Sequence, residues 1–109
     1  MNEPYERRAC LRLPVRWPVR IASSNGKDIT LDAVTENLSS QGFYCWVRRA
    51  FKPGDTLHCV IEFPHRVSIW ARKLRMRCEA EVVRSECGSE TGLYGVACHI
   101  RDYSIEVVD

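Results

Sequence analysis

The sequence predicts an all-β protein whose fold is a six-stranded antiparallel β-barrel. Apolar and polar residues alternate along about six short segments, and no segment repeats its apolar residues with helical spacing. Without a helix to cover one face, a small antiparallel sheet buries that face and removes its free edges by closing on itself. The length of 109 residues fits one domain with one core. We expect any C-terminal helix to be short or absent.

The first three expected strands form the N-terminal half of the barrel. Residues 15–21 alternate apolar side chains with outward-facing arginines, which is the pattern of a half-buried strand. Asn25-Gly26 is typical of the two-residue turn of a β-hairpin, and a second strand over residues 28–36 follows it. Gly42 then begins a third strand after a polar turn.

The last three expected strands follow the turn signal Pro53-Gly54-Asp55. Residues 56–63 alternate, residues 78–82 lie in a long strand, and residues 93–100 form the last one. Residues 101–109 are interpreted as a short polar tail. The sequence thus predicts two parts, an N-terminal segment over 1–14 and a barrel domain over 15–109.

The six cysteines are predicted to be reduced core residues. No CxxC pair occurs, and four cysteines fall on the apolar side of their own strands, namely Cys45, Cys59, Cys78 and Cys98. Cysteine behaves in such positions as a small hydrophobe, so we expect neither disulfides nor a metal site.

The composition predicts a cytoplasmic protein with no membrane insertion. Residues 1–6 are polar and acidic, unlike a signal peptide, and no apolar run approaches the roughly 20 residues that cross a bilayer. The net charge is only +2, which is too small to make the whole molecule a strong nucleic-acid binder.

No catalytic motif occurs in the sequence. The three histidines, His58, His65 and His99, are tied by no spacing to a nucleophile and an orienting carboxylate. His58 and His99 alternate out of the apolar faces of their strands, so we expect them at the surface. The sequence therefore predicts no enzymatic activity and no cofactor.

Two polar stretches predict a binding site when they are taken together. Arg8 and Arg12 are an even number of residues apart, so in an extended segment both guanidinium groups face one ligand, with Arg7 beside them. Arginine binds phosphate through a planar fork and reads the O6/N7 edge of guanine. The stretch 37–42 offers an amide at Asn37, hydroxyls that include Ser39, and Gly42, which is able to adopt backbone conformations closed to other residues.

The chain resembles the PilZ domain family, bacterial receptors for the second messenger cyclic di-GMP. The family motifs are Arg-x-x-x-Arg near the N-terminus and Asp/Asn-x-Ser-x-x-Gly after one hairpin. Here they read Arg8-Ala9-Cys10-Leu11-Arg12 and Asn37-Leu38-Ser39-Ser40-Gln41-Gly42. Further family-like stretches lie at 51–55, 80–84 and 92–97, so the resemblance spans about residues 6–100.

The resemblance implies a receptor whose arginine segment wraps over a nucleotide bound to the barrel. Arg8 and Arg12 would contact phosphate and guanine, Asn37 and Ser39 would hydrogen-bond the ligand, and Gly42 would permit close backbone approach. Arg7 adds a phosphate contact in this interpretation. The segment 1–14 is then mobile without ligand, and its ordering changes the surface offered to a downstream protein partner, which the sequence does not identify.

Two alternatives fit the same sequence. The first is a PilZ-like barrel that binds no nucleotide and serves as a protein-interaction module. The second is an RNA-binding or single-strand-binding barrel that stacks bases on Tyr44, Trp46 and Trp70. Trp46 is the aromatic residue of greatest interest, because it lies on the face opposite Phe43 and Cys45.

Overall fold

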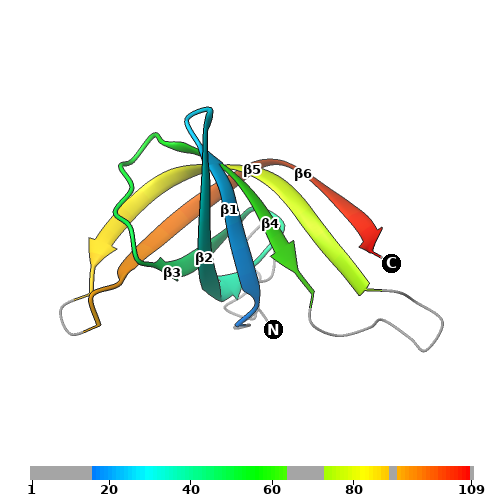
Figure 1. Cartoon of the computed structure of the whole chain (residues 1–109), viewed down its shortest axis with the longest axis horizontal. Helices are drawn as coiled ribbons and strands as arrows, with labels where there is room; N and C mark the ends of the chain where they lie inside the picture. The colour runs from blue at the N-terminus through cyan, green and yellow to red at the C-terminus, as the bar shows by residue number, and fades with distance from the viewer. Residues whose placement is uncertain (1–15, 64–72, 89–90, 109) are drawn as a thin grey trace, which may run out of the picture.

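The computed structural model describes residues 16–63, 73–88 and 91–108, and these form six antiparallel strands (Figure 1). The strands are β1 (Pro18–Ser24), β2 (Lys27–Leu38), β3 (Gly42–Val47), β4 (Thr56–Glu62), β5 (Lys73–Cys87) and β6 (Tyr94–Val108). They close into a barrel in the order β1-β2-β3-β6-β5-β4. This confirms the predicted fold class. The expected N-terminal segment, residues 1–14, lies outside the described part of the chain.

The barrel interior is filled by the apolar side chains that alternate along each strand. All six strands contribute, and the most completely buried members include Ile21, Leu57, Ile61, Val82 and Val96. Alternation places these side chains on one face of the sheet, and closure turns that face inward. The described residues contain no helix that is long and apolar enough to cross a membrane.

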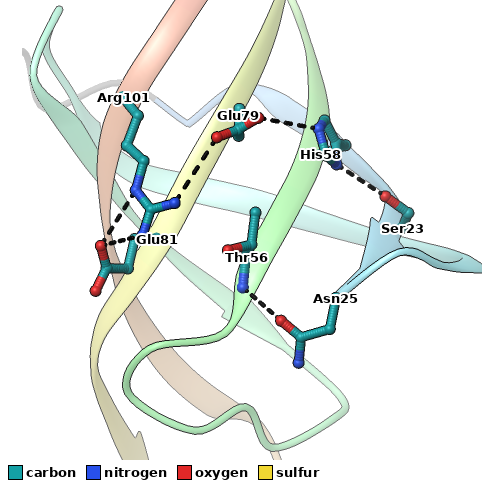
Figure 2. Close-up of polar contacts among 7 residues, drawn as sticks. All are labelled: Ser23, Asn25, Thr56, His58, Glu79, Glu81 and Arg101. Atoms are coloured by element: carbon teal, nitrogen blue, oxygen red, sulfur yellow. Dashed lines mark hydrogen bonds and ion pairs between the residues drawn. The ribbon is translucent and has the colours of Figure 1, made fainter.

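The hairpin between β1 and β2 has the predicted Asn-Gly turn. Asn25 and Gly26 both have positive φ angles, 51° and 82°, as a type I′ turn requires. The Asn25 side chain also fixes the neighbouring strand, because its Oδ1 accepts the Thr56 N–H at 2.8 Å (Figure 2). Its Nδ2 donates to Asp55 at 3.0 Å. The turn therefore ties the β1–β2 hairpin to the start of β4.

The four cysteines predicted to lie in the core are buried free thiols. Cys59 and Cys78 lie directly opposite each other on β4 and β5. Burial raises the pKa of Cys45 to about 12, so its thiol stays protonated at neutral pH. Cys87 is exposed at the end of β5, and Cys10 lies outside the described residues.

The expectation of a polar tail after residue 100 is wrong. β6 continues to Val108 and pairs with β5 over its whole length, from Tyr94 opposite Cys87 to Val108 opposite Lys73. β3 pairs only with the first part of β6, up to Gly42 opposite His99. Residues 73–79 and 102–108, called the arm, therefore extend the barrel wall past the end of β3, with β6 at its outer side (Figure 1). On the other side of the arm, β5 remains paired with β4 up to Arg75 opposite Glu62.

Candidate functional site

The turn between β2 and β3 carries the Asn-x-Ser-x-x-Gly motif, and Ser39 holds this turn closed. The Ser39 Oγ accepts the backbone N–H groups of Gln41 and Gly42, each at 3.2 Å, and donates to the Gly42 carbonyl at 3.3 Å. The Ser39 N–H donates to the same carbonyl at 2.9 Å. One hydroxyl thus satisfies three backbone groups, so this side chain defines the shape of the turn.

Asn37 presents its side chain amide on the outer face of the barrel. It belongs to β2 and lies opposite Tyr44 of β3, next to a β-bulge that begins after Thr35. Directly opposed residues in an antiparallel pair share a face of the sheet, so Asn37 stands beside the Tyr44 ring. Both residues are half-buried. The motif therefore places an amide next to an aromatic surface.

Gly42 is required by the closeness of the neighbouring strand and not by its own backbone angles. Its φ is not positive, so the expectation of a special backbone conformation is wrong. A Cβ at this position would lie 2.4 Å from the Cys98 carbonyl oxygen on β6. The adjacent Gln41 carbonyl accepts the Ile100 N–H at 2.8 Å. The end of the motif is thus fastened to β6 by direct backbone contact.

An open groove of about 650 Å³ lies on the outer face of β2 and β3. Val34 and Trp46, which are paired across the two strands, form part of its lining, and Leu93 adds to it from the β5–β6 connection. Arg16 and Arg48 are its cationic lining residues. The groove therefore combines an apolar floor with cationic side chains, as sites for planar anionic ligands do.

An aromatic pair connects this groove to the motif. The rings of Tyr44 and Trp46 meet edge to face, with centroids 5.5 Å apart and an interplanar angle of 82°. Tyr44 pairs with Asn37, and Trp46 lines the groove. The outer face therefore carries an amide, a phenol and an indole side by side, from the motif to the groove. Desolvation, and after it the charge of Glu86, raises the pKa of Tyr44, so the phenol is a neutral hydrogen-bond donor at neutral pH.

The fixed charges of the groove nearly balance. Arg16 and Arg48 are accompanied by Asp32 and Glu36, and the Asp32 carboxylate already accepts Arg20 Nε at 3.3 Å. A groove with two cations and two carboxylates gives little net attraction for a dianion. An anionic ligand would need further cations from another part of the chain. Among the described residues, no group of His, Cys, Asp and Glu side chains is placed to hold a metal ion.

Half of the predicted site residues lie in the described part of the chain, and the structure brings these together. Asn37, Ser39 and Gly42 share one turn at the end of the β2–β3 hairpin. The three arginines expected in the site, Arg7, Arg8 and Arg12, lie outside the described residues.

Arg16 and Arg48 are groove residues that the sequence did not single out. Both alternate outward from apolar neighbours, which is also what ordinary surface residues do, so only the groove distinguishes them. Trp46 had a usable signal, because a large aromatic residue faced away from the predicted core.

A polar row on another part of the outer face was also unforeseen (Figure 2). Ser23, His58 and Glu79 are directly opposed on β1, β4 and β5. The Ser23 Oγ lies 3.0 Å from His58 Nδ1, and His58 Nε2 lies 3.4 Å from Glu79. Arg101 of β6 binds Glu81 and approaches Glu79 at 3.8 Å.

This row has the residue types of a hydrolase triad but not the surroundings of one. A hydrolase also needs an oxyanion hole and a substrate cleft. The row lies on the outer wall, the His58 side chain is 53% exposed, and none of the three residues lines the groove. The arrangement fits a surface hydrogen-bond and ion-pair network that follows from strand register.

Comparison with known proteins identifies the family. The PilZ domain model matches residues 6–108 of the sequence. The chain belongs to the PilZ domain family. This confirms the resemblance that the two motifs indicated, and the match includes both of them. No curated protein matches this PilZ chain significantly.

Two solved PilZ-like structures share the fold of this PilZ domain. The inhibitor of motility MotI/DgrA from Bacillus subtilis superposes with a TM-score of 0.70 at 18% identity, over 90% of this chain and 44% of that one. The PilZ domain of YcgR from Escherichia coli, solved with c-di-GMP, gives a TM-score of 0.56 at 12% identity. That match covers 88% of this chain and 79% of the YcgR chain. The PilZ chain thus spans less than half of MotI/DgrA.

Proposed function

We propose that this PilZ domain is a receptor for cyclic di-GMP. The observation that carries the proposal is the continuity of the outer face of β2 and β3, where the Ser39-closed turn, the Asn37 amide, the aromatic pair and the groove follow one another. The motif alone is a common kind of turn. Next to an aromatic groove of this size it offers hydrogen bonds at one end and a stacking surface at the other.

The N-terminal arginines supply the charge that the groove lacks. Arg12 is four residues from Arg16, so a fully extended chain separates their Cα atoms by at most about 14 Å. An arginine side chain is long enough to cover much of that distance, so Arg12 is able to reach a ligand in the groove that Arg16 lines. In this proposal Arg7, Arg8 and Arg12 bind the phosphates and guanine edges, and Asn37 binds from the barrel. Ser39 supports the site by keeping the turn closed, because its hydroxyl is already used by three backbone groups.

The expected affinity follows from a few strong contacts. Each charge-assisted hydrogen bond contributes roughly 1.5–3 kcal/mol in a protected site, and stacking of a base on an aromatic ring contributes about 1–3 kcal/mol. Micromolar affinity corresponds to about 8 kcal/mol. Two or three arginine contacts and one stacked base therefore suffice after part of the energy is spent on ordering the arginine segment.

Binding is also proposed to change the surface that the domain offers to another protein. Ligand phosphates neutralise the arginines and order residues 1–14 across the barrel, and the ordered segment then forms part of a new protein-binding face. Amide exchange at residues 6–14 should slow when cyclic di-GMP is added. Unchanged exchange rates there would remove the ordering step, even if the nucleotide binds.

Isothermal titration calorimetry with cyclic di-GMP tests the proposal directly. Saturable binding is expected, and Arg8→Ala and Arg12→Ala should each abolish most of it. Arg77→Ala is a matched control, because Arg77 binds Glu106 on the arm, away from the groove. Undiminished affinity in both N-terminal variants would refute the site assignment. Absence of binding in the wild type would favour the protein-interaction module instead.

Trp46 provides a second, local readout. Its indole lines the groove, so a stacked guanine should quench its fluorescence. Trp46→Phe keeps an apolar ring and should bind cyclic di-GMP several-fold more weakly, whereas Trp46→Ala should lose more. A steep salt dependence with oligonucleotides and none with the dinucleotide would instead support the RNA-binding alternative.

A further inference from the structure

The outer edge of the arm is a strand edge that remains although the barrel is closed. β6 pairs with β3 only as far as His99, and among the described residues nothing pairs with the outer edge of 101–108. No described residue pairs with the backbone N–H and C=O groups along that edge, which makes it suited to pairing with another strand. The closed barrel has no free strand edge of its own, but β6 extends beyond β3 and so has a free edge within the described residues.

This edge also carries an apolar stripe on one face. Tyr103, Ile105 and Val107 are 48%, 47% and 60% exposed. They lie opposite Cys78, Met76 and Leu74 of β5, the first two of which are buried core residues. The stripe is thus the inner face of the barrel wall carried past the point where the barrel covers it. Exposed edges with apolar faces are strong templates for strand addition.

The edge lacks two of the residue types that often protect such strands, although charged residues and a β-bulge at its base are present. Residues 101–108 contain no proline and no lysine. On the polar face, Glu106 is bound by Arg75 and Arg77 of the neighbouring strand, so its charge does not repel an incoming strand strongly. Within the described part of the chain, the β6 strand of the arm is therefore paired with β5 on one side and has no partner strand on the other.

We propose that the occupant of this edge is the same edge of a second copy of the chain. Two β6 strands pair antiparallel about a two-fold axis at Ile105, which joins the two arms into one continuous sheet. Opposed residues in an antiparallel pair share a face, so this register sets Ile105 against Ile105 and Tyr103 against Val107 twice. Every apolar side chain of the stripe meets another apolar side chain.

The charges of the polar face select this register over its neighbours. An axis at Ile105 places Ser104 opposite Glu106 and Asp102 opposite Val108, with no like charges opposed. An axis at Ser104 would set Asp102 against Glu106, two carboxylates. A shift by one residue would turn the apolar stripe of one copy onto the polar face of the other. The sequence of the edge is thus complementary to itself in one antiparallel register.

The dimer leaves the groove of each copy open. The groove lies on β2 and β3, whereas the contact uses only the arm beyond the point where β3 stops pairing with β6. The two proposals are therefore independent, and each has its own assay. In the dimer a two-fold axis relates the two grooves, which suits a receptor that presents two ligand-dependent faces to one partner.

Sedimentation of the full chain over about 10–500 μM tests the contact through the concentration dependence of its mass. The wild type is expected to dimerise, and Ile105→Lys should weaken dimerisation by at least about tenfold, because it sets two charges against each other on the axis. Val83→Lys is the matched control, since Val83 is a valine 53% exposed on β5 outside the stripe. It should dimerise like the wild type.

Crosslinking distinguishes this register from other contacts. Opposed Cα atoms in an antiparallel pair are about 4.5–5.5 Å apart, within the range of a disulfide. Ile105→Cys in a Cys87→Ser background should form a covalent dimer when oxidised glutathione takes up the two electrons and two protons of the introduced thiols. Val83→Cys in the same background should not. This pair of variants also decides the case in which Ile105→Lys fails to fold.

Several results would overturn the proposal. They are a wild type that stays monomeric throughout, a dimer that Ile105→Lys does not weaken, or an Ile105→Cys chain that does not crosslink. Slow amide exchange at 101–108 in a monomer would show that the chain covers its own edge, and would also overturn it. Loss of dimerisation with intact cyclic di-GMP binding would leave the receptor proposal standing, and the reverse result would leave the dimer standing.

Discussion

Replacing Gly42 with alanine tests whether the binding turn is fastened to the barrel as the structure indicates. The new methyl group would lie 2.4 Å from the Cys98 carbonyl oxygen, whereas carbon–oxygen contacts between strands are about 3.3 Å or longer. The two backbones must therefore move apart by roughly 0.9 Å at this point. Neither side of the contact is a flexible side chain, so the strain cannot be relieved by a rotamer change.

The expected loss of stability is about 2 kcal/mol. Overpacking of this kind costs about 1–3 kcal/mol. The adjacent hydrogen bond from the Ile100 N–H to the Gln41 carbonyl, now 2.8 Å, would lengthen and cost about 1 kcal/mol more. Alanine restricts the unfolded chain more than glycine, which returns about 0.4–1 kcal/mol. Because the same movement opens the Ser39 turn, affinity for cyclic di-GMP should fall as well.

Urea unfolding followed by tryptophan fluorescence measures this loss, and Gly95→Ala provides a matched comparison. A Cβ at Gly95 would lie only 1.9 Å from the Tyr44 hydroxyl, but that atom is the end of a half-buried side chain, which is able to swing outward. Gly95→Ala should therefore cost about 1 kcal/mol, chiefly the Tyr44–Trp46 contact. The reasoning is refuted if Gly42→Ala costs less than about 0.5 kcal/mol, or if Gly95→Ala costs as much.

Three further predictions concern the turns and the core. Ser39→Ala removes the hydroxyl that serves three backbone groups, so it should weaken cyclic di-GMP binding in calorimetry while the circular dichroism spectrum of the barrel is unchanged; unaltered affinity would contradict this role. Asn25→Ala should cost about 1–2 kcal/mol in urea unfolding, because alanine disfavours the positive φ of 51° and the bond to Thr56 is lost, and a wild-type midpoint would argue against it. The pKa of Cys45 is raised from 9.0 to about 12, so its contribution to stability is complete below pH 9 and is lost as the pH rises toward 12. That loss is about 1.4 kcal/mol at pH 10, and Cys45→Val should show a shallower decline in stability between pH 8 and pH 10 than the wild type; equal slopes would be inconsistent with the shift.

The strand pattern of the core was predictable because burial requires an apolar residue at every second position of a strand. Each inward position must be apolar, so Cys45, Cys59, Cys78 and Cys98 were recognised from their place in the alternation alone. The Asn25-Gly26 turn was predictable for a similar reason, since few residues tolerate two consecutive positive φ angles.

The second half of β6 was missed although its signal is present. Tyr103, Ile105 and Val107 alternate with polar residues, but the stripe has no covering layer within the described chain, and a short exposed alternation is hard to tell from a tail. Its assignment as a strand depends on pairing with β5, whose residues 73–79 are far away in the sequence.

By itself, the sequence determined the all-β class, the members of the core, the family and the residues of the motif at 37–42. These are local properties, because each depends on residue type and on spacing along one strand or turn. Only the tertiary structure decided why Gly42 is glycine, that Arg16 and Arg48 share a groove with Trp46, and that Ser23, His58 and Glu79 form a row. Those facts depend on which strands are neighbours and in what register, and barrel closure sets both through contacts between residues that the sequence keeps far apart.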